Sequence, residues 1–145
     1  MYYLRYFLLL LALCARFCGA CAQQPQNTAY QLYISQFKDL AIEQMQRYRI
    51  PASITLAQGL FESRAGQSRL ATVGNNHFGI KCHGWKGRSI NVDDDAIGEC
   101  FRAYDNAKQS YEDHSKFLRN NQRYAMLFQL SPTDYRGWAK GLKAC

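Results

Sequence analysis

The clearest hydrophobic pattern in the chain begins at residue 28. Apolar side chains recur there every three or four residues up to about residue 47, which is the period of an amphipathic helix. A second helix is predicted over residues 53–64, after Pro51, because the first turn of a helix tolerates proline. Gly66 is expected to close this helix, since glycine readily adopts the left-handed conformation of helix ends. The pattern therefore predicts two helices in the first half of the chain.

The periodicity changes in the middle of the chain. A short helical turn at residues 67–73 is followed by Gly74-Asn75-Asn76, which breaks the helical pattern. Residues 88–104 then alternate between apolar and polar side chains in the manner of strands. Aspartates and glycine, which favour turns, occupy residues 93–98, so we predict a β-hairpin around them.

Three further helices are predicted in the last third. Asn106 and Gln109 form a capping-box signature at the start of one helix, and residues 123–130 form another, shorter one. Residues 131–134 (SPTD) open a last helix that carries Trp138. The predicted fold class is α+β, mostly helical, with one small β-hairpin.

The first 22 residues have a different character. Arg5 precedes an apolar run at residues 6–15, and small residues end at Ala22, which is typical of a secretory signal peptide. The run falls short of the roughly 20 residues that span a bilayer, so we expect no permanent membrane span. An uncleaved anchor and a lipid on Cys21 stay open, although the residues before Cys21 fit a lipidation signal poorly. We expect an exported protein with a signal peptide (1–22), a linker (23–27) and one domain (28–145).

Export affects how the cysteines are interpreted, because exported proteins can keep disulfides. Cys82 and Cys100 lie on either side of the predicted hairpin, so we expect them to be bridged, with Cys145 left over. His77 and His83 are metal-ligand types, but no C-x-x-C or H-x-x-x-H spacing accompanies them. We therefore expect no metal site and no cofactor.

The formal net charge is +7, and the predicted signal peptide accounts for two of its positive charges. A basic exported protein is attracted to anionic polymers, of which nucleic acid and cell wall are both examples. The lysines and arginines are scattered along the sequence, so we expect no nucleic-acid groove. The aromatic fraction of 14% suits carbohydrate binding, because aromatic rings stack on the apolar faces of sugars.

One carboxylate, that of Glu62, differs from the others in its setting. It follows Leu60-Phe61 and precedes small residues near the predicted helix end, so its side chain should enter partly apolar surroundings. Such surroundings raise a carboxyl pKa by desolvation, as a general acid working near neutral pH requires. From the spacing alone, a structural ion pair with Arg64, Lys81 or another cation explains this glutamate better than catalysis does.

Two motifs resemble a known enzyme family. Residues 56–66 (LAQGLFESRAG) and 74–81 (GNNHFGIK) resemble the glucosaminidase domains of glycoside hydrolase family 73, whose pattern is Ala-Gln-x-x-x-Glu-Ser and then Asn-Asn-x-Phe-Gly-x-Lys. These include the wall-cutting domain of flagellar rod-assembly proteins and many bacterial autolysins. The resemblance extends from about residue 34 to the end, with residues 99–104 (ECFRAY) matching the returning hairpin strand. It implies a lysozyme-like fold whose hairpin lines the cleft.

The resemblance also implies a function and a site. The activity would be that of a monomeric endo-β-N-acetylglucosaminidase acting on peptidoglycan glycan strands, with Glu62 protonating the glycosidic oxygen. A second carboxylate, where the family uses one, falls at residues 93–95; we expect Asp94 to supply it and the other two aspartates to form a turn. Retaining, inverting and substrate-assisted courses stay open. The expected substrate contacts are Asn76, Phe78, Tyr104 and Tyr111.

The sequence departs from the family pattern at its end. Family members continue with Gly-Tyr-Ala-Thr-Asp or a close variant, whose tyrosine commonly lines the active site, whereas this sequence ends at residues 141–145 (GLKAC). We therefore expect a domain that lacks its C-terminal end, with core surface uncovered near Trp138 and with its activity in question.

Three other functions stay open. A non-catalytic peptidoglycan-binding domain would be favoured if Glu62 were exposed or paired with an arginine. A lytic transglycosylase would also use one glutamate but would form an anhydro product. An exported interaction domain held by the Cys82–Cys100 bridge would leave the glutamate helix unexplained.

Overall fold

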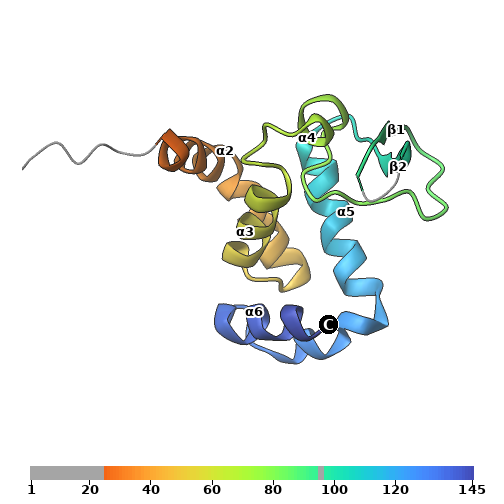
Figure 1. Cartoon of the computed structure of the whole chain (residues 1–145). Helices are drawn as coiled ribbons and strands as arrows, with labels where there is room; N and C mark the ends of the chain where they lie inside the picture. The colour runs from red at the N-terminus through yellow and green to blue at the C-terminus, as the bar shows by residue number, and fades with distance from the viewer. Residues whose placement is uncertain (1–24, 95–96) are drawn as a thin grey trace, which may run out of the picture.

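The computed structural model describes residues 25–94 and 97–145 (Figure 1). The expected signal peptide and Cys21 lie outside these residues. The fold is α+β and mostly helical, with one antiparallel hairpin, as the sequence predicts. In chain order its elements are α2 (Pro25–Tyr48), α3 (Ala52–Glu62), α4 (Arg69–Gly74), β1 (Ser89–Val92), β2 (Glu99–Arg102), α5 (Ala107–Asn120), the 3₁₀ helix η1 (Gln122–Gln129) and α6 (Tyr135–Ala144).

The long helix α2 begins earlier than its apolar pattern predicts. Its first residue is Pro25, so residues 25–27 of the expected linker are helical. Proline suits this position because its fixed φ is compatible with the first helical turn. None of the helices in residues 25–94 and 97–145 combines the length and the apolar character needed to cross a membrane.

The later helices begin at the caps that the sequence predicts. The Asn106 side chain accepts a hydrogen bond from the Gln109 N–H at 3.1 Å, and the Gln109 side chain accepts one from the Asp105 N–H at 3.0 Å. The Asp134 carboxylate accepts from the Gly137 N–H at 2.9 Å in the first turn of α6. Each contact satisfies a backbone donor that a helix start leaves unpaired, which fixes where α5 and α6 begin.

The hairpin is attached to the loop that precedes it. β1 and β2 pair antiparallel, with Ser89 opposite Arg102, and Lys81 makes a bridge to Phe101. Cys82 and Cys100 form a disulfide, the pairing expected from the sequence. β2 and the loop over residues 76–83 are therefore joined both by backbone pairing and by a covalent bond.

Two clusters of apolar side chains form the core. The first lies between α2, α3, α5 and the loop after α4, and the second joins α3 and α5 to η1 and α6, which lie together at one end of the molecule (Figure 1). Trp138 is fully buried in the second cluster, which corrects the expectation of uncovered core surface around it. The first cluster is Tyr33, Phe37, Ala41, Phe78, Ile80 and Tyr111, and the second is Ile50, Ile54, Leu118, Leu127 and Trp138.

Candidate active site

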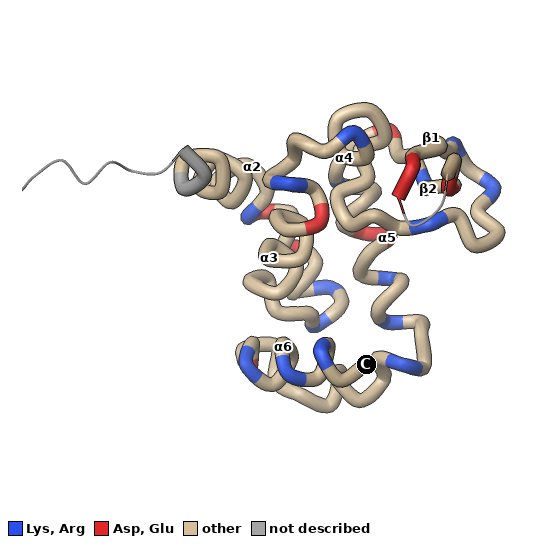
Figure 2. Tube along the Cα trace, viewed as in Figure 1, with Lys and Arg blue, Asp and Glu red and all other residues tan. Residues whose placement is uncertain are grey.

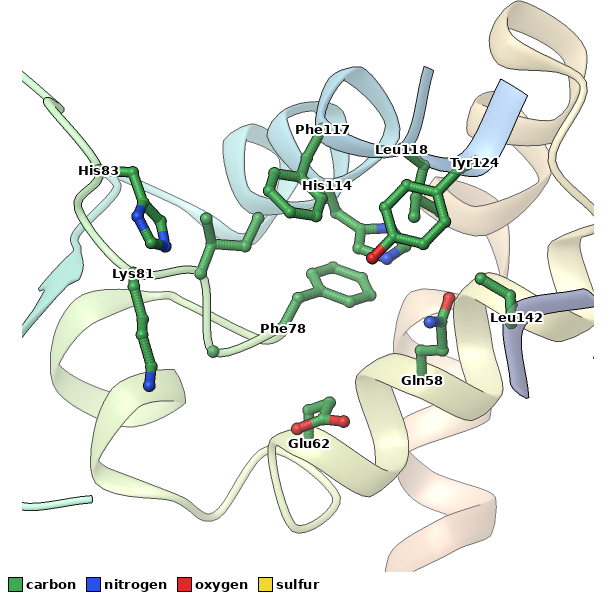
Figure 3. A pocket seen from close by; sticks show the side chains of 12 residues that line it. Gln58, Glu62, Phe78, Lys81, His83, His114, Phe117, Leu118, Tyr124 and Leu142 are labelled. Atoms are coloured by element: carbon green, nitrogen blue, oxygen red, sulfur yellow. The ribbon is translucent and has the colours of Figure 1, made fainter. Parts of the chain in front are cut away.

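A pocket of about 370 Å³ opens between α3, the loop after α4, and the C-terminal helices (Figure 3). Helix α3 contributes side chains to one side, and α5, η1 and α6 contribute side chains to the opposite side. The lining therefore combines segments that are far apart in the sequence. Its residues are Gln58, Glu62, Phe78, Gly79, Ile80, Lys81, His83, His114, Phe117, Leu118, Tyr124 and Leu142.

Glu62 is the last residue of α3 and lies at the edge of this pocket (Figure 3). The helix ends there because residues 64–66 all take left-handed backbone conformations, which are costly for the two residues that are not glycine. The buried Ser63 holds this turn, since its hydroxyl donates to the Gly59 carbonyl at 2.5 Å and accepts from the Gly66 N–H at 2.7 Å. Strained backbone next to a carboxylate is a feature of functional sites.

The surroundings of Glu62 favour its protonated form. Burial raises the pKa of Glu62 above its ordinary value, and the negative charge of Asp94 raises it further. No arginine or lysine forms an ion pair with Glu62 within residues 25–94 and 97–145; Lys81 pairs instead with Glu99 at 2.8 Å. Glu62 therefore does not form the structural ion pair with Arg64 or Lys81 that the sequence left open.

Glu62 is nevertheless exposed on the molecular surface. This is one of the two outcomes that would favour a binding domain without catalysis. It is equally what an empty cleft requires, because a general acid has to be reached by the bond that it protonates. Exposure alone therefore does not separate the two functions, and the raised pKa favours the catalytic one.

Asp94 lies in the loop of the hairpin, and its charge acts on Glu62. Its neighbour Asp93 stabilises the hairpin turn, because its carboxylate accepts a hydrogen bond from the Gly98 N–H at 2.7 Å. Asp95 lies outside the described residues. Because Asp93 is engaged in the turn, Asp94 stays the candidate for a second carboxylate in this run of aspartates.

Phe78 forms an aromatic surface of the pocket opposite Glu62 (Figure 3). It stacks on His114 with ring centroids 3.9 Å apart and meets Tyr111 edge-on at 4.9 Å. A side chain at Gly59 would approach the Phe78 ring to 3.3 Å and the Tyr33 hydroxyl to 2.6 Å. Glycine in mid-helix therefore lets α3 pack closely against the loop that presents Phe78.

Asn76 does not line the pocket, which corrects the expected substrate contact. Its side chain is buried, and its amide donates to the carbonyls of Ile80 and Arg102 at 3.0 and 2.9 Å. Its oxygen accepts from the N–H groups of Ile80 and Phe78 at 3.1 and 3.4 Å. Because both ends of the amide are occupied, Asn76 shapes the loop that carries Phe78 and cannot bind sugar in this conformation.

The two expected tyrosine contacts are also corrected. Tyr111 is fully buried behind Phe78, and its hydroxyl lies 3.0 Å from that of Tyr33. Tyr104 is buried elsewhere and donates to the Asp113 carboxylate at 2.6 Å. Burial raises the pKa of both Tyr104 and Tyr111. Neither hydroxyl faces the pocket, so both residues stabilise the domain instead of contacting substrate.

Several lining residues were missed in the sequence. Gln58 shares a helix face with Glu62, so the spacing of four could have identified it. His114 and Tyr124 give no local signal, because only folding brings α5 and η1 beside α3. Burial lowers the pKa of His114 to about 3, so its ring is neutral near pH 7. Metal binding has no basis in the described residues, where no three His, Cys, Asp or Glu side chains form a suitable group.

Comparisons with known proteins show what this chain is similar to. Over 98 residues the chain is 32% identical to the exo-glucosaminidase LytG of Bacillus subtilis (strain 168), a match that covers 68% of this chain and 34% of that protein. The chain thus spans about a third of the length of this relative.

Solved structures show the same fold. A peptidoglycan hydrolase from Sphingomonas sp. A1 superimposes with a TM-score of 0.65 and 27% identity, over 78% of this chain and 75% of that one. The glycoside hydrolase domain of Salmonella typhimurium FlgJ gives a TM-score of 0.67 at 23% identity, over 79% and 75%. The fold is therefore the lysozyme-like one that the resemblance implied.

The family model described as mannosyl-glycoprotein endo-β-N-acetylglucosaminidase matches residues 38–145, which include α3, the hairpin and all the residues that line the pocket. By this match the chain belongs to the glucosaminidase family.

Proposed function

We propose that this protein hydrolyses the β-1,4 bonds of peptidoglycan glycan strands on the reducing side of N-acetylglucosamine. The observation that carries the proposal is the position of Glu62, a carboxyl with a raised pKa and no cationic partner among the described residues, at the edge of a pocket with an aromatic wall. Membership of a glycosidase family supports the reaction class. Because glycan strands belong to the cell wall, we infer that the protein acts at the cell envelope.

In this proposal Glu62 is the general acid. Its raised pKa keeps the carboxyl protonated to a higher pH than an ordinary glutamate, so that it can donate a proton to the glycosidic oxygen. Protonation makes the sugar leaving group neutral, and positive charge then develops on the anomeric carbon. Phe78 gives the pocket an apolar lining opposite Glu62, although its ring is largely buried and packs on His114 and Tyr111.

Asp94 is the proposed second carboxylate. As an anion near Glu62, it can stabilise the positive charge on the anomeric carbon or activate the attacking water. Burial and, in addition, the negative charge of Asp94 raise the pKa of Glu62, which favours the protonated form that a general acid needs. The anomeric form of the first product would tell retention from inversion.

The test is the release of soluble fragments from purified peptidoglycan, reduced and weighed by mass spectrometry. Fragments with reduced N-acetylglucosamine ends are the expected products. Glu62→Gln should lower their release about 1,000-fold, within the range found for loss of a general acid. Its melting temperature should match the parent, because the exposed side chain makes no described ion pair. The matched control is Glu43→Gln on α2, which should retain activity.

The products also separate the rival functions. The exposure of Glu62 is also compatible with a domain that binds glycan without cutting it, and this function predicts that the protein sediments with insoluble wall but releases nothing. A lytic transglycosylase would give anhydro ends, which cannot be reduced and are therefore lighter than reduced hydrolysis products by one water and two hydrogens. Muramic acid at the reducing ends would contradict the proposed bond.

Endo and exo cleavage are distinguished by fragment length. The family description names an endo-acting enzyme, whereas the Bacillus relative is named an exo-glucosaminidase. We propose the endo mode. It predicts a broad range of strand lengths early in the reaction, while an exo enzyme would release only short fragments from the strand ends.

A further inference from the structure

The positive charge of the described chain is concentrated at one end. Residues 25–115 contain ten basic and ten acidic side chains, so their formal charges cancel. Residues 116–145, here called the basic lobe, contain six basic side chains and one acidic one. The basic lobe comprises the last turn of α5 together with η1 and α6, where lysines and arginines recur along the trace (Figure 2). Its members are Lys116, Arg119, Arg123, Arg136, Lys140 and Lys143.

The two parts also differ in how their cations are paired. Half of the cations in residues 25–115 form salt bridges, namely Arg47, Lys81, Arg88, Arg102 and Lys108. In the basic lobe, Lys116 pairs with Glu112, and the other five cations form no salt bridge within residues 25–94 and 97–145. All five are exposed. The basic lobe therefore presents a positive charge that the described part of the chain does not neutralise.

The basic lobe is also one wall of the active-site pocket. Leu118, Tyr124 and Leu142 line the pocket, and each is next in sequence to a basic residue. Consecutive Cα atoms are about 3.8 Å apart, so the Cα atoms of three cations lie beside those of pocket-lining residues, although their side chains do not line the pocket themselves. These cations are Arg119, Arg123 and Lys143.

We propose that the basic lobe binds the carboxylates of the stem peptides carried by the glycan strand, so that the preferred substrate is peptide-bearing glycan and not bare glycan. This inference rests on the proposed function and specifies its substrate. Every second sugar of a peptidoglycan strand can carry a peptide with free carboxylates. A strand in the pocket would therefore bring anions to the wall where the unneutralised cations lie, and exposed charges of opposite sign attract there.

The test compares two substrates made from one peptidoglycan preparation that has been freed of wall-linked phosphate polymers. One half keeps its stem peptides, and the other half loses them to an N-acetylmuramoyl-L-alanine amidase, which leaves a single lactyl carboxylate on each muramic acid in place of the several carboxylates of a peptide. The purified protein should cleave the peptide-bearing half about tenfold faster at low substrate concentration, as expected for a few exposed ion pairs. High salt should reduce this ratio, because it screens exposed charges.

Two variants with equal loss of charge locate the effect. The lobe variant combines Arg123→Gln, Lys140→Gln and Lys143→Gln, and its ratio should fall close to one. The control variant combines Lys38→Gln, Arg49→Gln and Lys86→Gln, three exposed cations without a salt bridge to a described residue, and its ratio should stay near tenfold. A lobe variant that keeps the preference, or a control that loses it equally, would overturn the inference.

Binding separates this inference from the proposed reaction. Each triple variant is also made together with Glu62→Gln, and its retention on immobilised wall glycan is measured with and without stem peptides, because strands without their peptide cross-links are soluble. If the parent cleaves neither substrate, the proposed function fails, and retention still decides the inference. Retention that depends on both the stem peptides and the basic lobe supports it. Equal retention on both walls, as a general polyanion or bare-glycan binder would show, contradicts it.

Discussion

The two walls of the pocket are held in place by different forces. The first wall, formed by α3 and the loop over residues 76–83, is fixed by directional contacts: the four hydrogen bonds of Asn76, the turn around Ser63 and the disulfide. The second wall, the basic lobe, is held by apolar packing around Trp138. Directional bonds can hold a reacting carboxyl in one orientation, whereas apolar packing holds a surface that need only fit a bulky polymer.

The first prediction concerns Trp138, the large buried side chain around which the second wall packs. Trp138→Ala should lower the free energy of unfolding by about 4 kcal/mol, because a large buried side chain is lost and leaves a cavity. Trp138→Phe is the control and should cost much less, since the indole N–H has no hydrogen-bond partner among the described residues. Denaturant unfolding of both variants gives the values. A small effect of Trp138→Ala would show that the basic lobe does not depend on this cluster.

The second prediction concerns Asn76, whose hydrogen bonds hold the loop of the first wall in its conformation. Asn76→Ala should cost about 3 kcal/mol, because it leaves buried backbone groups of Ile80 and Arg102 without their partner. Asn75→Gly is the control: Asn75 makes one side-chain hydrogen bond, and glycine accepts its left-handed backbone. Thermal and denaturant unfolding should rank Asn76 well above Asn75. Equal losses of unfolding free energy would show that Asn76 stabilises the loop no more than Asn75 does.

The third prediction concerns how the stability of the fold changes as the pH falls. Burial lowers the pKa of His77 to about 4 and that of His114 to about 3. Both values lie below the ordinary 6.5, so the unfolded chain binds protons that the folded chain does not. The stability is complete above pH 6.5 and declines as the pH falls toward 4. Unfolding experiments should show a loss of about 2 kcal/mol between pH 7 and 5.5.

A matched pair of histidine variants checks the origin of this acid effect. His77→Gln cannot gain a proton and should reduce the pH-dependent loss by about half. The exposed His83, replaced by Gln, should leave it unchanged. If both variants keep the full pH dependence, other groups are responsible for it.

The last prediction concerns Asp94, the proposed second carboxylate in the hairpin loop, whose replacement by asparagine should lower the peak rate and also move the pH profile of activity. Asp94→Asn removes the negative charge that raises the pKa of Glu62, so this pKa should fall. The alkaline limb of the pH profile, along which Glu62 loses its proton and activity falls, should then move to lower pH by less than about one unit. Asp93→Asn is the control, because Asp93 closes the hairpin turn. Identical alkaline limbs for parent and Asp94→Asn would exclude this coupling.

The sequence was most informative where contacts are local. The cap at Asn106 and Gln109, the turn around residues 93–98 and the end of α3 depend on groups a few residues apart, and they formed as predicted within a few residues. Glu62 was identified through its family motif, and the pocket that it lines agrees with that choice. Its catalytic role stays a prediction until Glu62→Gln is measured.

The sequence misled where the same residue type can serve two purposes. An asparagine and two tyrosines in family motifs suggested sugar contacts, yet Asn76, Tyr104 and Tyr111 are buried and bonded within the protein. A polar aromatic or amide group suits a sugar and a satisfied core equally well. Which of the two it meets depends on neighbours that are distant in the sequence.

The sequence alone therefore determined the helices, the hairpin, the disulfide pairing and the motif around Glu62, because periodicity, caps and turns act over a few residues. Only the tertiary structure decided which side chains line the pocket and which cations are neutralised. Tyr124 and Leu142 reach Glu62 across more than sixty residues of chain, and the partners of Arg47 and Lys108 lie equally far along the sequence. Burial and charge compensation are properties of three-dimensional neighbours, so no local pattern could specify them.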